Sequence, residues 1–159
     1  MPTGRARDGS FPRSVGVLGH GFLTEPILQR LLRALPAATH ITTFGRNPDV
    51  LAQLQRLGAR RAASPADLAA RSEYVIVLLD NLDDLEAHLR GPSGLLAGVH
   101  SPTILVFGGI SAPDDLRNLT SDLVEQTAGL LRIVDAPLTG TQATAVRGDL
   151  VIAVGTMPS

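Results

Sequence analysis

Residues 15–24 read VGVLGHGFLT, and this stretch decides the fold of the 159-residue chain. Its first part is apolar throughout, as in a buried strand, and its glycines come where a helix would begin. In a dinucleotide fold the first such glycine makes the tight turn and the second lets the backbone approach a pyrophosphate. The helix N-terminus adds free N–H groups and a positive dipole end. The stretch therefore predicts a pyrophosphate site at Gly19, His20, Gly21, Phe22 and Leu23.

The third position of this G-x-G-x-x-G fingerprint departs from the usual pattern. Glycine or alanine normally stands there so that the helix can pack closely on the strand, whereas this chain has Thr24. The alternative interpretation is a glycine turn between a strand and a helix that binds no ligand. The rest of the chain favours the ligand site, because the turn falls in the first βαβ unit of an α/β pattern.

Short apolar runs alternate with helical patterns along the rest of the chain. The runs are apolar throughout rather than at every second residue, which indicates a parallel sheet covered on both faces. We therefore expect an α/β, doubly wound fold, with residues 1–13 as a flexible leader and 14–159 as one domain. The predicted strands are 14–19, 39–44, 74–79, 103–107, 131–134 and 150–154, and the predicted helices are 22–35, 49–57, one starting at Ser64–Pro65, 81–89 and 113–129.

Composition excludes several classes of chemistry. There is no cysteine, so disulfides, thiolate metal sites and cysteine nucleophiles are absent, and all 14 basic residues are arginines. Without lysine there is no Walker A loop and no Schiff-base lysine. A net charge of −1 argues against a nucleic-acid partner. The four histidines lack metal-ligand spacing. No apolar stretch is long enough to cross a bilayer, so we expect a cytoplasmic protein with no membrane partner.

A second indication of function follows the second predicted strand. An NAD site tends to carry an acid there to bind the ribose 2′-hydroxyl, but this chain has Arg46 and Asn47 and no acid before Asp49. An arginine can pair with a 2′-phosphate, which favours NADP as the cofactor. The alternative is an ordinary surface arginine. A methyltransferase with a similar glycine turn is disfavoured, because its nucleoside ribose also calls for an acid at this position.

Together these motifs resemble the nucleotide-binding domain of the 6-phosphogluconate dehydrogenase and β-hydroxyacid dehydrogenase superfamily, which includes 3-hydroxyisobutyrate dehydrogenases and imine reductases. Residues 19–26, GHGFLTEP, are similar to that family's G-x-G-x-M-G-x-P. Residues 44–48, FGRNP, match its N-R-T-P type of turn, and VLLD at 77–80 stands at its cofactor-lining strand end. DAPLTGT at 135–141 resembles its D-x-P-V-S-G-G substrate segment. The similarity covers nearly everything after residue 13.

The resemblance implies roles for further residues. Leu78, Leu79 and Asp80 would line the cofactor path, and Thr139, Gly140 and Thr141 would contact a substrate. The cofactor would exchange a hydride with a small hydroxy acid, carbonyl or imine.

The sequence also departs from the family. Gly109-Ile110 replaces the family's Ser-Thr pair, and its catalytic lysine and helical C-terminal domain have no counterpart here. We therefore expect no catalytic residue in this chain and no turnover by it alone, unless a second chain supplies the missing domain. The alternatives are a non-catalytic nucleotide-binding or interaction module, or a truncated gene product.

Overall fold

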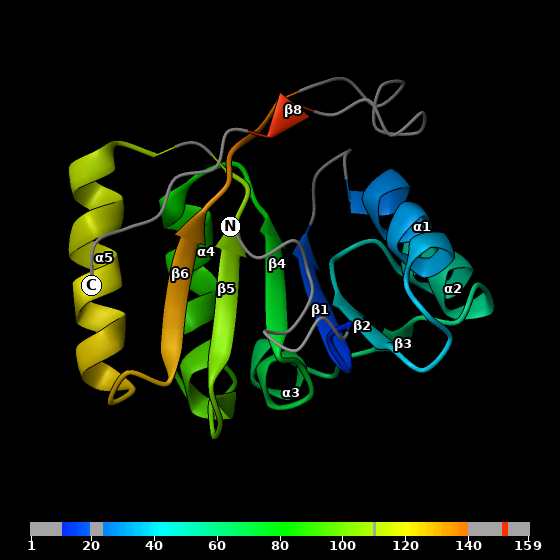
Figure 1. Cartoon of the computed structure of the whole chain (residues 1–159), viewed down its shortest axis with the longest axis horizontal. Helices are drawn as coiled ribbons and strands as arrows, with labels where there is room; N and C mark the ends of the chain where they lie inside the picture. Colours follow the sequence, from blue (N-terminus) through cyan, green and yellow to red (C-terminus); the bar gives the residue numbers. More distant parts are fainter. Residues whose placement is uncertain (1–10, 20–23, 110, 140–150, 153–159) are drawn as a thin grey trace.

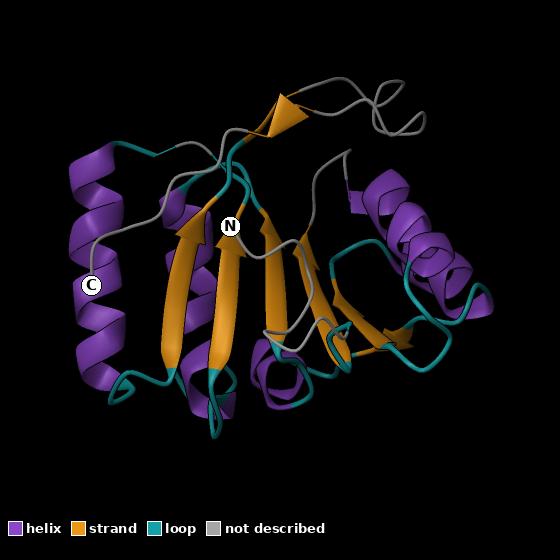
Figure 2. Cartoon of the chain, viewed as in Figure 1, coloured by secondary structure: helices purple, strands orange, loops and turns teal. Residues whose placement is uncertain are grey.

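The computed structural model describes residues 11–19, 24–109, 111–139 and 151–152, and it is built around a six-stranded parallel sheet (Figure 1). The strand order is β3-β2-β1-β4-β5-β6, and every neighbouring pair is parallel. Figure 2 shows the arrowheads of β4, β5 and β6 together at the upper edge of the sheet. The strands are β1 (Ser14–Gly19), β2 (His40–Phe44), β3 (Arg60–Arg61), β4 (Tyr74–Leu78), β5 (Thr103–Phe107) and β6 (Leu131–Asp135).

Helices begin where the sequence offers a side chain that can accept the free N–H groups of the first turn. The side chains of Asn47, Ser64 and Asn81 each accept a backbone hydrogen bond at the start of a helix, and proline takes the first helical position after two of them. The helices are α1 (Thr24–Ala34), α2 (Pro48–Arg56), α3 (Pro65–Ala70), α4 (Leu82–Leu89) and α5 (Pro113–Gln126), with a 3₁₀ turn η1 (Leu95–Gly98).

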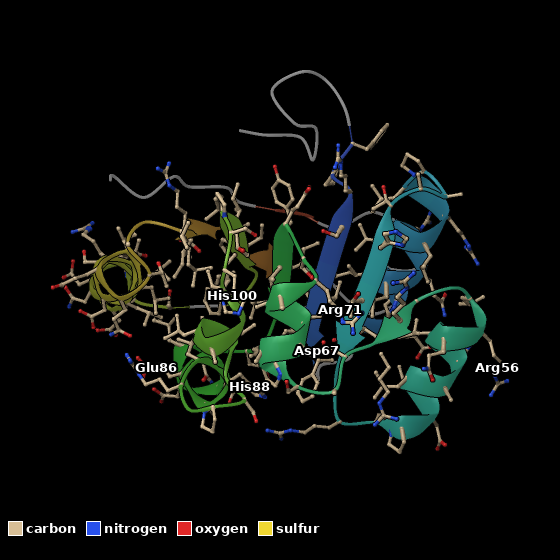
Figure 3. The ribbon with its side chains drawn as sticks, turned by 90° about the horizontal axis from the view of Figure 1, so that it is seen from below. Arg56, Asp67, Arg71, Glu86, His88 and His100 are labelled. Atoms are coloured by element: carbon tan, nitrogen blue, oxygen red, sulfur yellow. The ribbon has the colours of Figure 1, made fainter. Side chains whose placement is uncertain are left out.

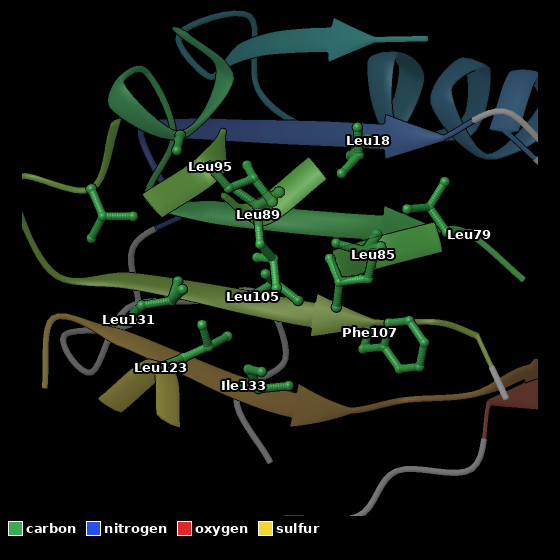
Figure 4. Packing of buried hydrophobic residues seen from close by; sticks show 14 of the residues in the cluster. Leu18, Leu79, Leu85, Leu89, Leu95, Leu105, Phe107, Leu123, Leu131 and Ile133 are labelled. Carbon is green, nitrogen blue, oxygen red and sulfur yellow. The ribbon is translucent and has the colours of Figure 1, made fainter. Parts of the chain in front are cut away.

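Two hydrophobic clusters fill the two faces of the sheet. The larger one joins α3, α4, η1 and α5 to side chains of β1, β4, β5 and β6, and its members Phe107 and Leu85 are fully buried (Figure 4). The smaller one joins α1 and α2 to Val17, Ile41 and Leu78. Successive side chains of a strand point to opposite faces, which is why Val17 and Leu18 belong to different clusters. Within the described ranges, no helix is both long and apolar enough to span a membrane.

The predicted α/β, doubly wound class is confirmed, and the differences are local. The two-residue strand β3 consists of exposed arginines and carries no apolar signal, so the sequence did not reveal it. Residues 150–154 were expected to form a strand of the parallel sheet. Instead, β8 (Val151–Ile152) pairs antiparallel with β7 (Leu138–Thr139) in a separate two-stranded sheet.

The end of the predicted leader is tied to the body of the domain. The carbonyl oxygen of Arg13 accepts a hydrogen bond from His40 N at 2.9 Å, and the Thr39 hydroxyl donates to the carbonyl oxygen of Pro12 at 2.9 Å. The Arg13 N–H donates to the Glu73 carboxylate at 3.1 Å. Residues 12–13 therefore adjoin the amino ends of β2 and β4. Residues 1–10 lie outside the described ranges.

Candidate functional site

The carboxyl ends of the parallel strands meet at one edge of the sheet, and the direction of strand addition reverses there between β1 and β4. Strand β1 pairs with β2 on one side, Leu18 opposite Phe44, and with β4 on the other, Gly19 opposite Leu78. Such a switch point leaves a crevice outside the strand ends, and this is where open α/β sheets bind their ligands. The predicted site residues around Gly19, Arg46 and Leu78 all follow these three strand ends.

Gly19 lies too close to its neighbours for any other residue. A Cβ built on it would come within 2.4 Å of the Thr24 Oγ1 and 3.1 Å of the Leu78 Cβ. Gly45 lies equally close to the end of β1, because its Cβ would stand 2.8 Å from the carbonyl oxygen of Gly19. Two glycines therefore let the end of β1, the start of α1 and the turn after β2 approach one another. The turn residues His20, Gly21, Phe22 and Leu23 lie outside the described ranges.

Arg46 and Asn47 lie exposed in the turn between β2 and α2. The Asn47 side-chain oxygen accepts hydrogen bonds from the N–H groups of Asp49, at 3.0 Å, and Val50, at 3.3 Å, so it caps α2. The amide nitrogen of Asn47 keeps two donor hydrogens that the cap does not use. The turn therefore presents a guanidinium and an amide group beside the glycine-rich crevice.

A cavity of about 310 Å³ extends from Arg46 toward α3 and α4. Among the described residues, two arginines and a histidine line it and no carboxylate does; these lining residues are Phe44, Arg46, Pro65, Ala87, His88, Arg90, Ser93 and Gly94. The His88 ring meets the Phe44 ring edge-on at 6.3 Å between centroids. Figure 3 shows His88 on α4, and Asp67 on α3 beside Arg71, which directly follows that helix. The described lining is cationic and partly aromatic, which suits an anionic ligand with a flat ring.

Sequence reasoning missed His88 and Arg90 as members of this site. His88 Nδ1 lies 2.7 Å from the carbonyl oxygen of Asp84, and the Arg90 guanidinium donates to Gln126 Oε1 at 3.0 Å. Both stand at the carboxyl end of α4, where basic groups commonly complement the helix dipole. Their pattern along the chain therefore looks like ordinary helix termination. Only the strand order β2-β1-β4 brings them close to Arg46.

The three residues predicted at the end of β4 divide between core and surface. Leu78 packs in the smaller cluster and Leu79 in the larger one, each at most 6% exposed, whereas Asp80 is exposed. The backbone of this segment lies against Gly109, whose Cβ would stand 2.3 Å from the carbonyl oxygen of Leu79. A serine in place of Gly109 would require the backbone to shift, so glycine fits this position.

The predicted substrate segment begins at the end of β6. Asp135 lies there opposite Phe107, half-buried, and burial raises the pKa of its carboxyl group. Thr139 lies in β7, where it pairs with Val151. Gly140 and Thr141 lie outside the described ranges, as does Ile110. No cluster of three or more potential metal ligands occurs within the ranges that the structure describes.

The sheet order, the switch point and the glycine turn define a dinucleotide-binding α/β domain. A family model of the NAD binding domain of 6-phosphogluconate dehydrogenase matches residues 14–159. The chain therefore belongs to this family, and its relatives include 3-hydroxyisobutyrate dehydrogenase-like proteins.

Among the relatives, L-threonate dehydrogenase of Cupriavidus necator is 32% identical over 138 residues, which is 87% of this chain and 44% of that protein. The solved structure of Psf3 in complex with NADP⁺ and 2-OPP has a TM-score of 0.75 and 23% identity, over 88% of this chain and 48% of that one. An imine reductase variant from Myxococcus stipitatus in complex with NAD⁺ has a TM-score of 0.70 and 18% identity, over 84% and 43%. The chain thus spans less than half the length of each.

Proposed function

We propose that this chain binds NADP(H), with the pyrophosphate on the glycine turn at residues 19–23 and the 2′-phosphate at Arg46 and Asn47. The observation that carries the proposal is the cavity at Arg46, whose described lining contains two arginines, a histidine and no carboxylate. A guanidinium forms paired, charge-assisted hydrogen bonds with a phosphate, while a carboxylate at this place would repel it. The family match supports a nicotinamide dinucleotide in general, and Arg46 is what favours NADP over NAD.

The local structure leaves hydrogen-bond donors of Arg46 and Asn47 available to a ligand. Asn47 caps α2 with its oxygen only, which leaves its amide nitrogen for a ligand oxygen. The first carboxylate after β2 belongs to Asp49, whose N–H is held by that same cap in the first turn of α2. Arg46 lies between the end of β2 and the cap of α2, and it lines the cavity.

As part of an oxidoreductase, the domain would position the cofactor rather than complete the reaction. The bound nicotinamide supplies the hydride that is exchanged with a small hydroxy acid, carbonyl or imine. In our proposal Leu78, Leu79 and Asp80 line the cofactor path through the backbone, and the segment Thr139, Gly140 and Thr141 contacts the substrate. A further domain or a second chain supplies the group that handles the proton, so this chain alone gives no turnover.

The test is a thermal melt with an environment-sensitive dye in the presence of NADPH, NADH or S-adenosylmethionine. A ligand at about 100 times its dissociation constant adds roughly 2.7 kcal/mol. For a domain of this size the midpoint should rise by about 5–10 °C with NADPH. Arg46→Ala should abolish most of that rise, while Arg56→Ala, an exposed arginine at the end of α2, serves as the matched control.

Two results would contradict the proposal. Equal stabilisation by NADH and NADPH in the wild type would remove the assignment of the 2′-phosphate to Arg46. A cooperative melt that responds to none of the three ligands would remove the cofactor site itself.

A nucleotide-binding module without catalysis is the second candidate, and the tight packing of Gly109 against Leu79 favours it, because no hydroxyl fits where the family holds its ligands. Both candidates predict NADPH binding without turnover by this chain alone, so the distinguishing result is whether the relatives' substrates are turned over once a further domain or second chain is supplied; no turnover then favours the non-catalytic module.

A further inference from the structure

Thr24 carries a buried hydroxyl that the described part of the protein leaves without a hydrogen bond. The residue is 7% exposed, and its Oγ1 has no partner. Three other buried hydroxyls are satisfied by a carbonyl oxygen: Thr43 by Val17 at 3.3 Å, Ser72 by Leu68 at 2.7 Å and Thr103 by Ser101 at 3.0 Å. A buried hydroxyl without a partner costs free energy, so each exception calls for an explanation.

The usual carbonyl acceptor of a helical threonine hydroxyl falls outside the described residues in the case of Thr24. Threonines within helices commonly donate to the carbonyl four residues earlier, as Thr120 does to Leu116 at 2.8 Å and Thr127 to Leu123 at 2.7 Å. Thr24 is the first residue of α1 that the structure describes, and the carbonyl four residues earlier belongs to His20, outside the described ranges. The Thr24 hydroxyl faces the end of β1, where a Cβ on Gly19 would stand 2.4 Å away.

We propose that Thr24 is a positioning residue whose hydroxyl donates a hydrogen bond to the pyrophosphate of the bound dinucleotide, directly or through one ordered water. This inference rests on the proposed function. Three observations meet at this point: a buried unpartnered donor, the N-terminus of an 11-residue helix, and the close approach of β1 to that helix. The dinucleotide fingerprint has glycine or alanine at this position, neither of which offers a side-chain donor. Thr24 would therefore add to the usual cradle of backbone N–H groups.

The inference predicts effects of opposite sign on the free protein and on binding. Thr24→Val keeps the shape of the side chain and removes the hydroxyl. The melting midpoint of the free protein should rise, because an unsatisfied buried group disappears. The affinity for NADPH should fall about tenfold or more, because a hydrogen bond to a charged acceptor is lost. Thr24→Ser keeps the hydroxyl and should bind NADPH with nearly the wild-type affinity.

The experiment compares titrations of NADPH and 2′-AMP by calorimetry, together with the melt of each free variant. Because 2′-AMP has the 2′-phosphate but no pyrophosphate, Thr24→Val should bind it with the wild-type affinity. Arg46→Ala should instead lower the affinity for both NADPH and 2′-AMP. Equal NADPH affinity of Thr24→Val and wild type would overturn the inference. A Thr24→Val variant with a lower midpoint and equally weakened binding of both ligands would show a purely structural residue. Failure of the wild type to bind NADPH would instead remove the proposed function on which the inference rests.

Discussion

The two faces of the sheet differ in how deeply their helices are packed. The face with α3, α4 and α5 holds a cluster of 18 buried residues, whereas the face with α1 and α2 holds six, with as many half-buried residues around them. The glycine turn leads into α1, and Arg46 and Asn47 precede α2. The glycine turn and Arg46 therefore adjoin the shallower layer, whereas α3, α4 and the loop that follows α4 in the deeper layer supply most of the cavity lining at Arg46. Binding elements often belong to the less stable part of a fold, because they must respond to a ligand.

The largest expected difference is in the cost of removing a leucine from each layer. Leu89 of α4 is fully buried in the larger cluster, and Leu31 of α1 is half-buried at the smaller one. Leu89→Ala should lower the free energy of unfolding by about 3–5 kcal/mol, because a cavity remains. Leu31→Ala should cost about 1 kcal/mol, since much of that side chain already meets water.

Urea denaturation measures both variants. Leu28→Ala is the informative control, because Leu28 is fully buried but belongs to the smaller cluster. A cost for Leu28→Ala well below that of Leu89→Ala would show that the shallow layer relaxes around the lost side chain. Equal losses in the free energy of unfolding for Leu31→Ala and Leu89→Ala would contradict the difference in packing between the two layers.

An intermediate effect is expected at the helix caps. Asn47→Ala on the shallow layer and Ser64→Ala on the deep layer should each cost about 1 kcal/mol, because each removes a side chain that accepts first-turn N–H groups. Only the Asn47→Ala variant should also bind NADPH more weakly than the wild type. Asn47→Asp separates the two roles: it retains the cap acceptor and stability but places a carboxylate at the proposed 2′-phosphate site. Chemical denaturation and NADPH titration of the three variants test this. Unchanged NADPH affinity in Asn47→Asp would remove Asn47 from the site.

The smallest effects concern two aspartates whose pKa values shift in opposite directions. The hydrogen bond from Arg71, 2.7 Å long, and that from the N–H of Ala63 lower the pKa of Asp67 below its ordinary 3.8, whereas burial raises the pKa of Asp135 above it. Asp67 therefore contributes stability above pH 3.8 that is lost as the pH falls through its lower folded value. Ionised Asp135 reduces stability as the pH rises from 3.8 through its higher folded value.

At neutral pH, Asp67→Asn should therefore destabilise and Asp135→Asn should stabilise, each by roughly a few tenths of a kcal/mol, because both half-buried groups are still partly screened by solvent. Denaturation midpoints at pH 7 and in acid measure this, and both differences from the wild type should shrink in acid. Shifts of the same sign at pH 7 would contradict the assigned environments.

The sequence predicted those features whose causes are local. The apolar runs identified β1, β4 and β5, and the Ser64 and Asn81 caps identified the starts of α3 and α4. The strand predicted at 150–154 is present at Val151–Ile152, but it pairs outside the six-stranded sheet, because an apolar run does not specify its partner. The cavity could not be predicted from the sequence either, since His88 and Arg90 become neighbours of Arg46 only through the order of the strands. The unpartnered state of Thr24 likewise depends on tertiary packing, although the departure from glycine was visible in the sequence.

Strand β3 has a consequence for symmetry. It forms one end of the six-stranded sheet, it has only two residues, and both are exposed arginines. Charge and brevity at an edge oppose the addition of another strand. The five-residue strand β6 forms the other end and has only β5 beside it in this sheet. Among the described strands, edge-to-edge contact between two copies would then have one usable edge per copy, and such a contact closes into a twofold pair instead of growing into a filament.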